Sequence, residues 1–309
     1  MSLLDVEERT RDVSPAVRAE AKQAVESIVA AALQSGGTGS TPESANKALR
    51  AMQSALCARG YRQPLRTDAW PDTIGQAFGT DPGKQPIDTD NCAMRAERST
   101  VGPTRFIVDC DMGAQLLVSA GQMLGWDIRV VNIPKHTFVR WHLRNGTAIN
   151  WDWTAGASYP DSHYEYRFSE RSKTIGAYGR SLTLTEAKGY YLSLIGSNAK
   201  DPLQGRQSVT EAIKLNPLDP VIQNNYAWFF ASHPSLGEPP ADALGFALAS
   251  LAWRPDDPNI IETVGCMYAA NGERDIALAL VQKAVTSGGA ESYRHHLKQI
   301  ELNGKCDGN

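Results

Sequence analysis

The stretch VDCDMGAQLLVSAGQMLGWDIRVVNIPKHTFVRWHLRNGTAINWDWT, residues 108–154, carries the clearest structural pattern of the chain. Apolar residues recur at helical spacing after Cys110, and Gly125 is a natural helix end. Two β-rich runs, DIRVVNI and HTFVRWHL, come next, and the turn RNG leads into a third, TAINWDWT. The pattern predicts a helix from Asp109 to Leu124, then a strand, then a hairpin.

The two faces of the hairpin predict its register. In both strands the odd-numbered positions are mostly apolar, whereas His136 and Asp152 lie on the opposite face. A two-residue turn would mix the faces, because a slip of one residue inverts every side chain. A three-residue loop with Gly146 in the left-handed conformation pairs Leu143 with Thr147 and keeps like faces together. Asp152 then lies diagonal to His136, within reach of it.

Cys110, His136 and Asp152 have the residue types of a thiol catalytic triad. An aspartate can orient an imidazole and stabilise its protonated form, while the other ring nitrogen acts as general base toward a thiol. The N-terminus of a helix favours a thiolate at Cys110, but Asp109 and Asp111 add negative charge that raises the pKa of the thiol. A nearby imidazolium must therefore supply much of the activation. The thiol reaches His136 only if the helix packs against the face that carries His136 and Asp152.

The N-terminal half of the chain is predicted to contain two helices and a wrapping segment. Helical spacing in residues 15–34 and 42–59 predicts a pair of helices within residues 1–60. Residues 61–106 are rich in Pro, Gly, Asp and Thr, which predicts an irregular wrap over a core that spans residues 61–195.

The last third of the chain contains a repeat. The sequence LNPLDPVIQNNYAWFFA beginning at Leu215 recurs as WRPDDPNIIETVGCMYAA beginning at Trp253, 38 residues later. Each copy continues into an Ala-rich helical pattern. We therefore predict a helical repeat segment over residues 205–300.

The composition excludes several classes of protein. The chain has 309 residues, of which 42% are hydrophobic, so a sizeable core can form. The net charge of -3 and the lack of a basic run argue against nucleic acid as a partner. No run approaches the roughly 18 apolar residues of a membrane span, and the N-terminus is acidic where a secretory signal is basic. We expect no membrane association and a cytoplasmic location, or export without a cleavable signal peptide.

The five cysteines are scattered, odd in number and without a C-x-x-C pair. We expect each to be a free thiol. Cys57 and Cys266 fall in helical patterns and are predicted to be small buried apolar residues. Cys110 is the cysteine predicted to have a chemical role.

Two resemblances follow from these motifs. CDMGAQLL opening a helix, then LGWDIRVVNI, HTFVRW and INWDWT, resemble the core of the transglutaminase-like superfamily over residues 105–156. The repeat resembles the tetratricopeptide repeat over residues 205–290, and bacterial members of the superfamily share this layout. The implied fold is α+β: a papain/transglutaminase-like core, in which the helix bearing the Cys packs on an antiparallel sheet, followed by an α-helical repeat segment.

The resemblance also implies a chemistry. Cys110 would be the nucleophile, His136 the base and Asp152 the orienting acid of a cysteine hydrolase or acyltransferase. Such an enzyme acts on an amide bond of a protein or peptide through a thioester, as an amidase or peptidase, a deamidase or a transglutaminase, without a cofactor. The alternative is a non-catalytic protein-interaction module that uses the helical repeats and keeps a relic core.

The surroundings of the triad are less defined by sequence. The backbone N–H of Cys110 is one expected oxyanion donor. The side-chain donor stays open among Trp70, Gln85 and Asn91, and Asn91 is also a predicted substrate contact. Trp153 and Tyr159 are predicted to wall a cleft that stacks on the substrate.

Histidines give little support for a metal site. His136 and His142 lie on one face of a strand about 20 Å apart, too far to share one ion. His163 stays open as a ligand, but we predict no metal. His295 and His296 are predicted to form a solvated helix face.

Overall fold

The computed structural model describes residues 13–64, 106–168 and 178–307, with the separate residues 5, 7, 8, 77, 78, 87, 88, 92 and 170. The chain divides into two compact units. The first consists mainly of Asp12–Phe168 with Tyr178–Leu184, and the second mainly of Thr185–Asn309. The first unit contains helices and antiparallel strands, and the second is helical, so the fold is α+β, as predicted.

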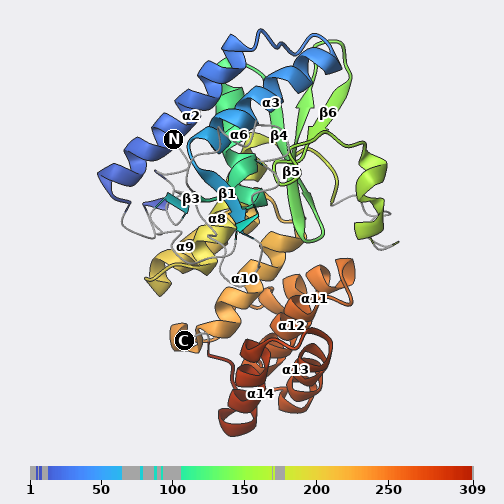
Figure 1. Ribbon diagram of the computed structural model, residues 1–309. Helices are drawn as coiled ribbons and strands as arrows, with labels where there is room; N and C mark the ends of the chain where they lie inside the picture. The colour runs from blue at the N-terminus through green and yellow to red at the C-terminus, as the bar shows by residue number, and fades with distance from the viewer. Residues whose placement is uncertain are drawn as a thin grey trace. The chain divides into compact units, whose positions relative to one another are not determined.

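The first unit begins with two helices, α2 (Pro15–Gln34) and α3 (Pro42–Ala58). Both start with Pro in the first turn after a hydroxyl N-cap, Ser14 or Thr41, whose side chain accepts a backbone N–H. Their buried faces pack against each other, and Figure 1 shows the two helices side by side. The predicted N-terminal pair of helices is confirmed.

Helix α6 (Cys110–Leu124) is the central helix of the first unit. The Asp109 carboxylate accepts the backbone N–H of Met112 at 2.9 Å and so caps the first turn. The helix ends at Gly125, whose φ of 68° is left-handed. Both ends are therefore those predicted from the sequence, and Cys110 occupies the first helical position.

The main sheet has the order β4-β5-β6 and is antiparallel. Its strands are β4 (Asp127–Ile133), β5 (His136–His142) and β6 (Ala148–Trp151). Val139 pairs with Trp151, and the Leu143 N–H donates to the Thr147 carbonyl at 2.8 Å. Gly146 has a φ of 83°. The three-residue loop and its register are thus confirmed.

Helix α6 packs on the apolar face of this sheet. A Cβ on Gly121 would lie 3.0 Å from Ile128, and a Cβ on Gly113 would overlap the Trp153 ring. Helix α6 therefore packs on the face opposite to the one that carries His136, which differs from the packing that the sequence was taken to require. Cys110 lies at the first position of the helix, at the end of this packed face.

The opposite face of the sheet is covered by the 3-10 helix η3 (Asp161–Arg167). The Tyr164 ring stacks on Phe138 with centroids 4.4 Å apart and an interplanar angle of 8°. Val131 and Ile133 complete this small core. The face that carries His136 and Asp152 is therefore packed as well, and the sheet is buried on both sides of the hairpin.

A second sheet, β2-β1-β3, joins segments that the sequence predicted to be an irregular wrap. Its strands are β1 (Tyr61–Pro64), β2 (Ile87–Asp88) and β3 (Phe106–Ile107). Strand β1 pairs antiparallel with β2 and parallel with β3. At these strands the prediction is wrong, because runs of two to four residues are too short to show a period. The rest of the predicted wrap lies outside the described residues.

Four of the five cysteines form disulfides, so the prediction of five free thiols is wrong. Cys57 is bonded to Cys92 and Cys266 to Cys306, each with Cα atoms 5.5 Å apart. The partners are 35 and 40 residues apart in the chain, so no local spacing announces the pairs. Cys110 alone is a free cysteine, and it is buried.

The second unit is a succession of helices. They are α8 (Leu184–Ser197), α9 (Pro202–Leu215), α10 (Pro220–Ser232), η4 (Pro234–Leu236), α11 (Ala243–Trp253), α12 (Pro258–Ala270), α13 (Arg274–Gly288) and α14 (Glu291–Asn303). Asp219 and Asp257 cap α10 and α12, each followed by Pro. The two copies of the sequence repeat therefore begin equivalent helices, and each is followed by the predicted Ala-rich helix.

One prediction about the second unit is wrong. His296 is buried and not solvated: its Nδ1 lies 2.7 Å from Oε1 of Glu262, which is buried too. Its ring meets Trp228 edge to face. Only His295 is exposed. Adjacent residues on a helix point about 100° apart, so a His-His pair cannot be assigned to one face as a unit.

We expect Gly113→Ala to destabilise the first unit by about 1–3 kcal/mol, because the added methyl overlaps the Trp153 ring. Gly245→Ala is the control: Gly245 lies within α11 with no atom within 4 Å of the added Cβ. That substitution should stabilise the helix by up to about 1 kcal/mol. Urea unfolding of the full chain measures both, and equal effects would contradict the packing described.

Candidate functional site

Cys110 is the first residue of helix α6 and lies close to the start of strand β5. Its side chain is 6% exposed. The backbone N–H of Thr137, the residue after His136, lies near enough to the thiol to lower its pKa. Strand β6 ends at Trp151, before it reaches the position opposite Thr137. The thiol thus lies beside the start of β5, next to the residue predicted to be its base.

The surroundings of Cys110 keep its thiol protonated. Burial raises the pKa of the Cys110 thiol well above its ordinary value, and the charges of Asp111 and Asp109 raise it further. The Thr137 N–H lowers the pKa and the charge of Asp152 raises it. The effect predicted for the two flanking aspartates is therefore present. In this conformation Cys110 is a neutral, buried thiol.

His136 and Asp152 form a close pair on the opposite face of the sheet from α6. Nε2 of His136 lies 2.6 Å from Oδ2 of Asp152, and both side chains are nearly buried. Because a carboxylate only accepts, Nε2 carries the hydrogen and Nδ1 is left as the acceptor nitrogen of a neutral ring. Among the residues that the structure describes, none is hydrogen-bonded to this Nδ1. The pair has the geometry that orients an imidazole for proton transfer.

Asp152 is held as a carboxylate by several donors. Its Oδ1 accepts the backbone N–H and the hydroxyl of Thr154, at 3.0 and 2.6 Å, and the N–H of Ala155 at 3.3 Å. Its Oδ2 also accepts the Tyr164 hydroxyl at 3.3 Å. Burial alone would raise the pKa of Asp152, but the hydrogen bonds from His136 and Thr154 outweigh it and lower the pKa. A charged acid is therefore stable in this buried position.

Gln53 fixes the chain on both sides of Asp152. From helix α3, its Nε2 donates to the carbonyl of Trp153 at 3.0 Å, and its Oε1 accepts the indole N–H of Trp151 at 3.3 Å. The side chain is buried. Sequence reasoning missed this residue; the only available signal was a glutamine on the apolar side of a predicted helix.

The turn before His136 is strained and supported. Lys135 has a φ of 59°, which is uncommon for a residue with a side chain. Arg167 of η3 donates to the carbonyls of Pro134 and Lys135 at 3.4 and 3.5 Å. Helix η3 therefore supports the site twice, through Arg167 at this turn and through Tyr164 at Asp152.

The other predicted site residues have different places. Trp153 is buried against Gly113 and donates its indole N–H to the Val108 carbonyl at 3.4 Å. Tyr159 is half-buried and stacks on His163 with centroids 4.0 Å apart. The predicted contacts of Trp153 and Tyr159 with a substrate stay predictions. Trp70, Gln85 and Asn91 lie outside the described residues.

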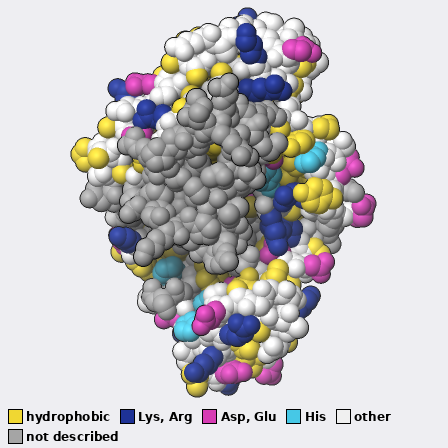
Figure 2. All heavy atoms as spheres, viewed as in Figure 1, with side chains coloured by type: hydrophobic (Ala, Val, Ile, Leu, Met, Phe, Trp, Pro, Cys, Tyr) yellow, Lys and Arg dark blue, Asp and Glu magenta, His cyan; other side chains and the backbone are white. Residues whose placement is uncertain are grey.

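Metal sites and membrane-spanning helices were sought among the residues that the structure describes. No group of three or more His, Cys, Asp and Glu side chains in that part of the chain could hold a metal ion. Within the same ranges, no helix combines the length and apolarity needed to cross a bilayer. On the face drawn in Figure 2, Lys and Arg side chains are interspersed with Asp and Glu.

Comparisons of the chain with models of protein families, with curated proteins and with solved structures found no match. The resemblances described above therefore rest on the motifs of the sequence alone.

The Asp152 network predicts a dependence of stability on acid. Because the folded pKa of Asp152 lies below its unfolded value, the unfolded chain binds this proton first. The contribution is complete above the ordinary carboxyl pKa of about 4 and is lost as the pH falls through the folded pKa. Asp152→Asn should flatten the fall in urea midpoint below about pH 4, whereas the exposed control Asp256→Asn should not. Equal slopes would contradict the network.

The buried thiol predicts slow alkylation. At pH 7, native Cys110 should react with iodoacetamide roughly tenfold or more slowly than a small free thiol, because the thiolate is scarce and the sulfur is covered. The rate should rise with pH beyond the ordinary thiol range and become normal in urea. Rapid labelling at pH 6 that His136→Ala abolishes would instead show a preformed thiolate–imidazolium pair.

Proposed function

We propose that this protein is a cysteine-dependent acyl-transfer enzyme with a papain/transglutaminase-like core, acting on an amide bond of a protein or peptide through a thioester. The observation that carries the proposal is the His136–Asp152 pair, with Nε2 of His136 2.6 Å from Asp152. The Nδ1 of His136 has no hydrogen-bond partner among the described residues, and the backbone N–H of the next residue, Thr137, lies near the Cys110 thiol. The order Cys, His, Asp of the transglutaminase-like superfamily supports it.

In this proposal the resting thiol is neutral, so the first step is general-base catalysis. Nδ1 of His136 takes the proton of Cys110 as the sulfur attacks the amide carbonyl carbon. Asp152 stabilises the imidazolium that forms. Backbone N–H groups in the first turn of α6 are suited to hold the developing oxyanion. The imidazolium then protonates the leaving amine, and the thioester passes its acyl group to water or to another amine.

The second unit extends this proposal to a protein partner. Helices α10 and α12 begin with the same Asp-Pro signal, 38 residues apart by their first residues Pro220 and Pro258. Helix pairs stacked in this way resemble the tetratricopeptide repeat, whose stacked helices offer an extended binding surface. In the proposed enzyme this segment binds a protein partner or a protein substrate.

One observation favours the alternative of a non-catalytic module with a relic core. Cys110 is buried with a raised pKa, which is also how an inert structural cysteine is placed. A buried carboxylate is costly unless hydrogen-bond donors satisfy it. Five donors satisfy Asp152, an arrangement that a relic core has no need to keep. We therefore place the enzyme first.

Mass spectrometry of Cys110 tests the proposed function. After incubation with a peptide library or a cell lysate, we expect an acyl adduct on Cys110 that hydroxylamine releases. Cys110→Ala should remove it, and His136→Ala should lower its formation by roughly a thousandfold or more. His142→Ala is the matched control, since His142 lies on the same strand and face but is hydrogen-bonded to Ser181.

Two results would decide against the enzyme. One is an adduct that forms equally in the wild-type chain and in His136→Ala, which would show non-specific acylation. The other is no adduct at all, together with capture of a protein by residues 185–309 within the full chain, which would support the interaction module.

A further inference from the structure

The cysteine pairs carry an inference about where this protein works. We infer that the chain matures and acts in an oxidising compartment, where a protein disulfide oxidises Cys57 with Cys92 and Cys266 with Cys306 and leaves Cys110 as the single thiol. All five cysteines lie among the described residues, so this pattern covers the full complement of the chain.

The first disulfide joins helix α3 to a distant part of the first unit. Cys57 is in the last turn of α3 and Cys92 lies 35 residues further on. Cys57 follows Gln53 by one helical turn, and Gln53 binds the residues on either side of Asp152. The disulfide therefore anchors the helix that supports the candidate acid, and both sulfurs are in buried residues.

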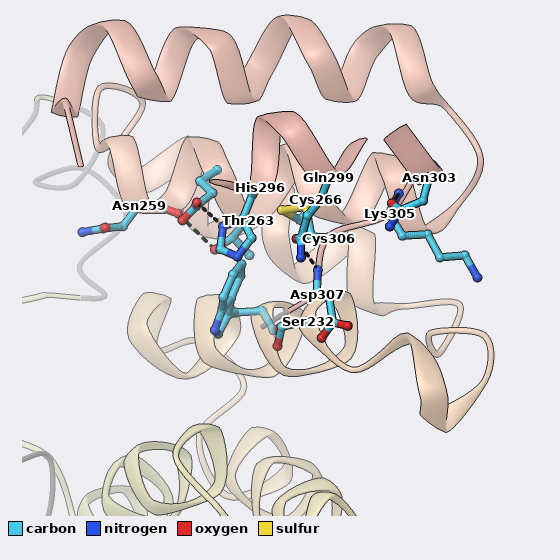
Figure 3. Close-up of a disulfide and its surroundings, with 12 residues drawn as sticks. Ser232, Asn259, Thr263, Cys266, His296, Gln299, Asn303, Lys305, Cys306 and Asp307 are labelled. Carbon is cyan, nitrogen blue, oxygen red and sulfur yellow. Dashed lines mark hydrogen bonds and ion pairs between the residues drawn. A yellow bond between two sulfur atoms is a disulfide. The ribbon is translucent and has the colours of Figure 1, made fainter. Parts of the chain in front are cut away.

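The second disulfide fastens the end of the chain. Cys306 follows helix α14 and is bonded to Cys266 of α12. Cys266 is one turn after Glu262, so the disulfide and the pair of Glu262 with His296 hold α14 on α12 side by side (Figure 3). The Asp307 N–H donates to the Gln299 side chain at 2.8 Å and closes the turn. Each unit thus has one disulfide of its own.

This pattern separates the two locations that the sequence left open. Disulfides persist in secreted proteins and in oxidising compartments and are rare in the reducing cytosol. Five cysteines can form at most two disulfides, and both are present here. Each disulfide closes a long loop, which restricts the unfolded chain more than a short loop does. An exported protein fits these observations better than a cytoplasmic one.

The position of Cys110 in the fold, and not its chemistry alone, limits its reaction with other thiols and disulfides once the chain has folded. Cys110 is 6% exposed at the start of α6, so its thiol is largely covered once the chain has folded. The attacking species in disulfide exchange is the thiolate. Burial raises the pKa of Cys110, which keeps that species scarce. The four paired cysteines are buried at least as deeply, so Cys110 differs from them by having no cysteine partner in the fold and not by its burial.

The oxidation balances with a disulfide as the co-reactant. The thiolate of one cysteine of a pair attacks the oxidant's disulfide, which forms a mixed disulfide and releases one thiolate of the oxidant. The second cysteine then attacks the first, which forms the bond in the chain and releases the other thiolate. Each pair loses two protons and two electrons, and the oxidant becomes a dithiol. Resting on the proposed function, the substrate of Cys110 is then a protein or peptide of that compartment.

Thiol counting tests the inference. The full chain is produced in the reducing cytosol of a host and, separately, with export into an oxidising compartment. Each sample is unfolded and treated with N-ethylmaleimide, and the mass of the intact chain is measured by mass spectrometry. We expect one adduct on the exported chain, five after reduction, and none on exported Cys110→Ala. A non-reducing digest should link the peptides of Cys57 with Cys92 and of Cys266 with Cys306.

Stability completes the test. The exported chain should melt higher than the five-thiol cytosolic chain by roughly 5–15 °C. Five adducts on the exported chain, a disulfide that includes Cys110, or equal melting temperatures would overturn the inference. These readouts need no activity, so they can fail or succeed independently of the acyl adduct on Cys110.

Discussion

The register of strands β5 and β6 is the constraint on which the first unit depends. With Gly146 left-handed, Val139 lies opposite Trp151, and the apolar face of the hairpin packs on two helices, β5 on α6 and β6 on α3. The same register places Asp152 beside His136 on the other face. A slip of one residue would exchange the faces, so it would bury the polar pair in the core and expose the indoles. The core and the candidate site are therefore two consequences of one turn.

The candidate site combines a charged acid with a neutral thiol, and each state has its own physical cause. Asp152 stays charged because hydrogen bonds outweigh its burial. Cys110 stays neutral because burial and the aspartates on either side of it act in the same direction. Asp109 has two opposed effects: it caps α6 and so fixes the position of the thiol, but its charge disfavours the thiolate. Placement of the sulfur and its activation are thus separate tasks, and the second falls to His136.

The sequence was most informative where structure is local. Helix α6, its capping Asp109 and the loop at Gly146 follow from periods and turn residues that lie within a few positions of one another. The pair of His136 with Asp152 could be predicted because a hairpin turns register into proximity. Gln53, Tyr164 and both disulfides act across long separations in the chain, where neither period nor spacing reports contact. Whether a cysteine is paired is therefore a property of the tertiary fold.

The face on which α6 packs shows how far such reasoning extends. Binary patterning predicts that the apolar faces of a helix and a sheet meet, and here they do, through glycines that admit Ile128 and Trp153. A site on the polar face must then be reached around the edge of the sheet, from a helix end. The first position of α6 and the first residues of β5 meet at such an edge, where the Thr137 N–H faces the thiol because β6 has already ended. The polar residues of the site and the apolar core can therefore share one hairpin without competing for the same face.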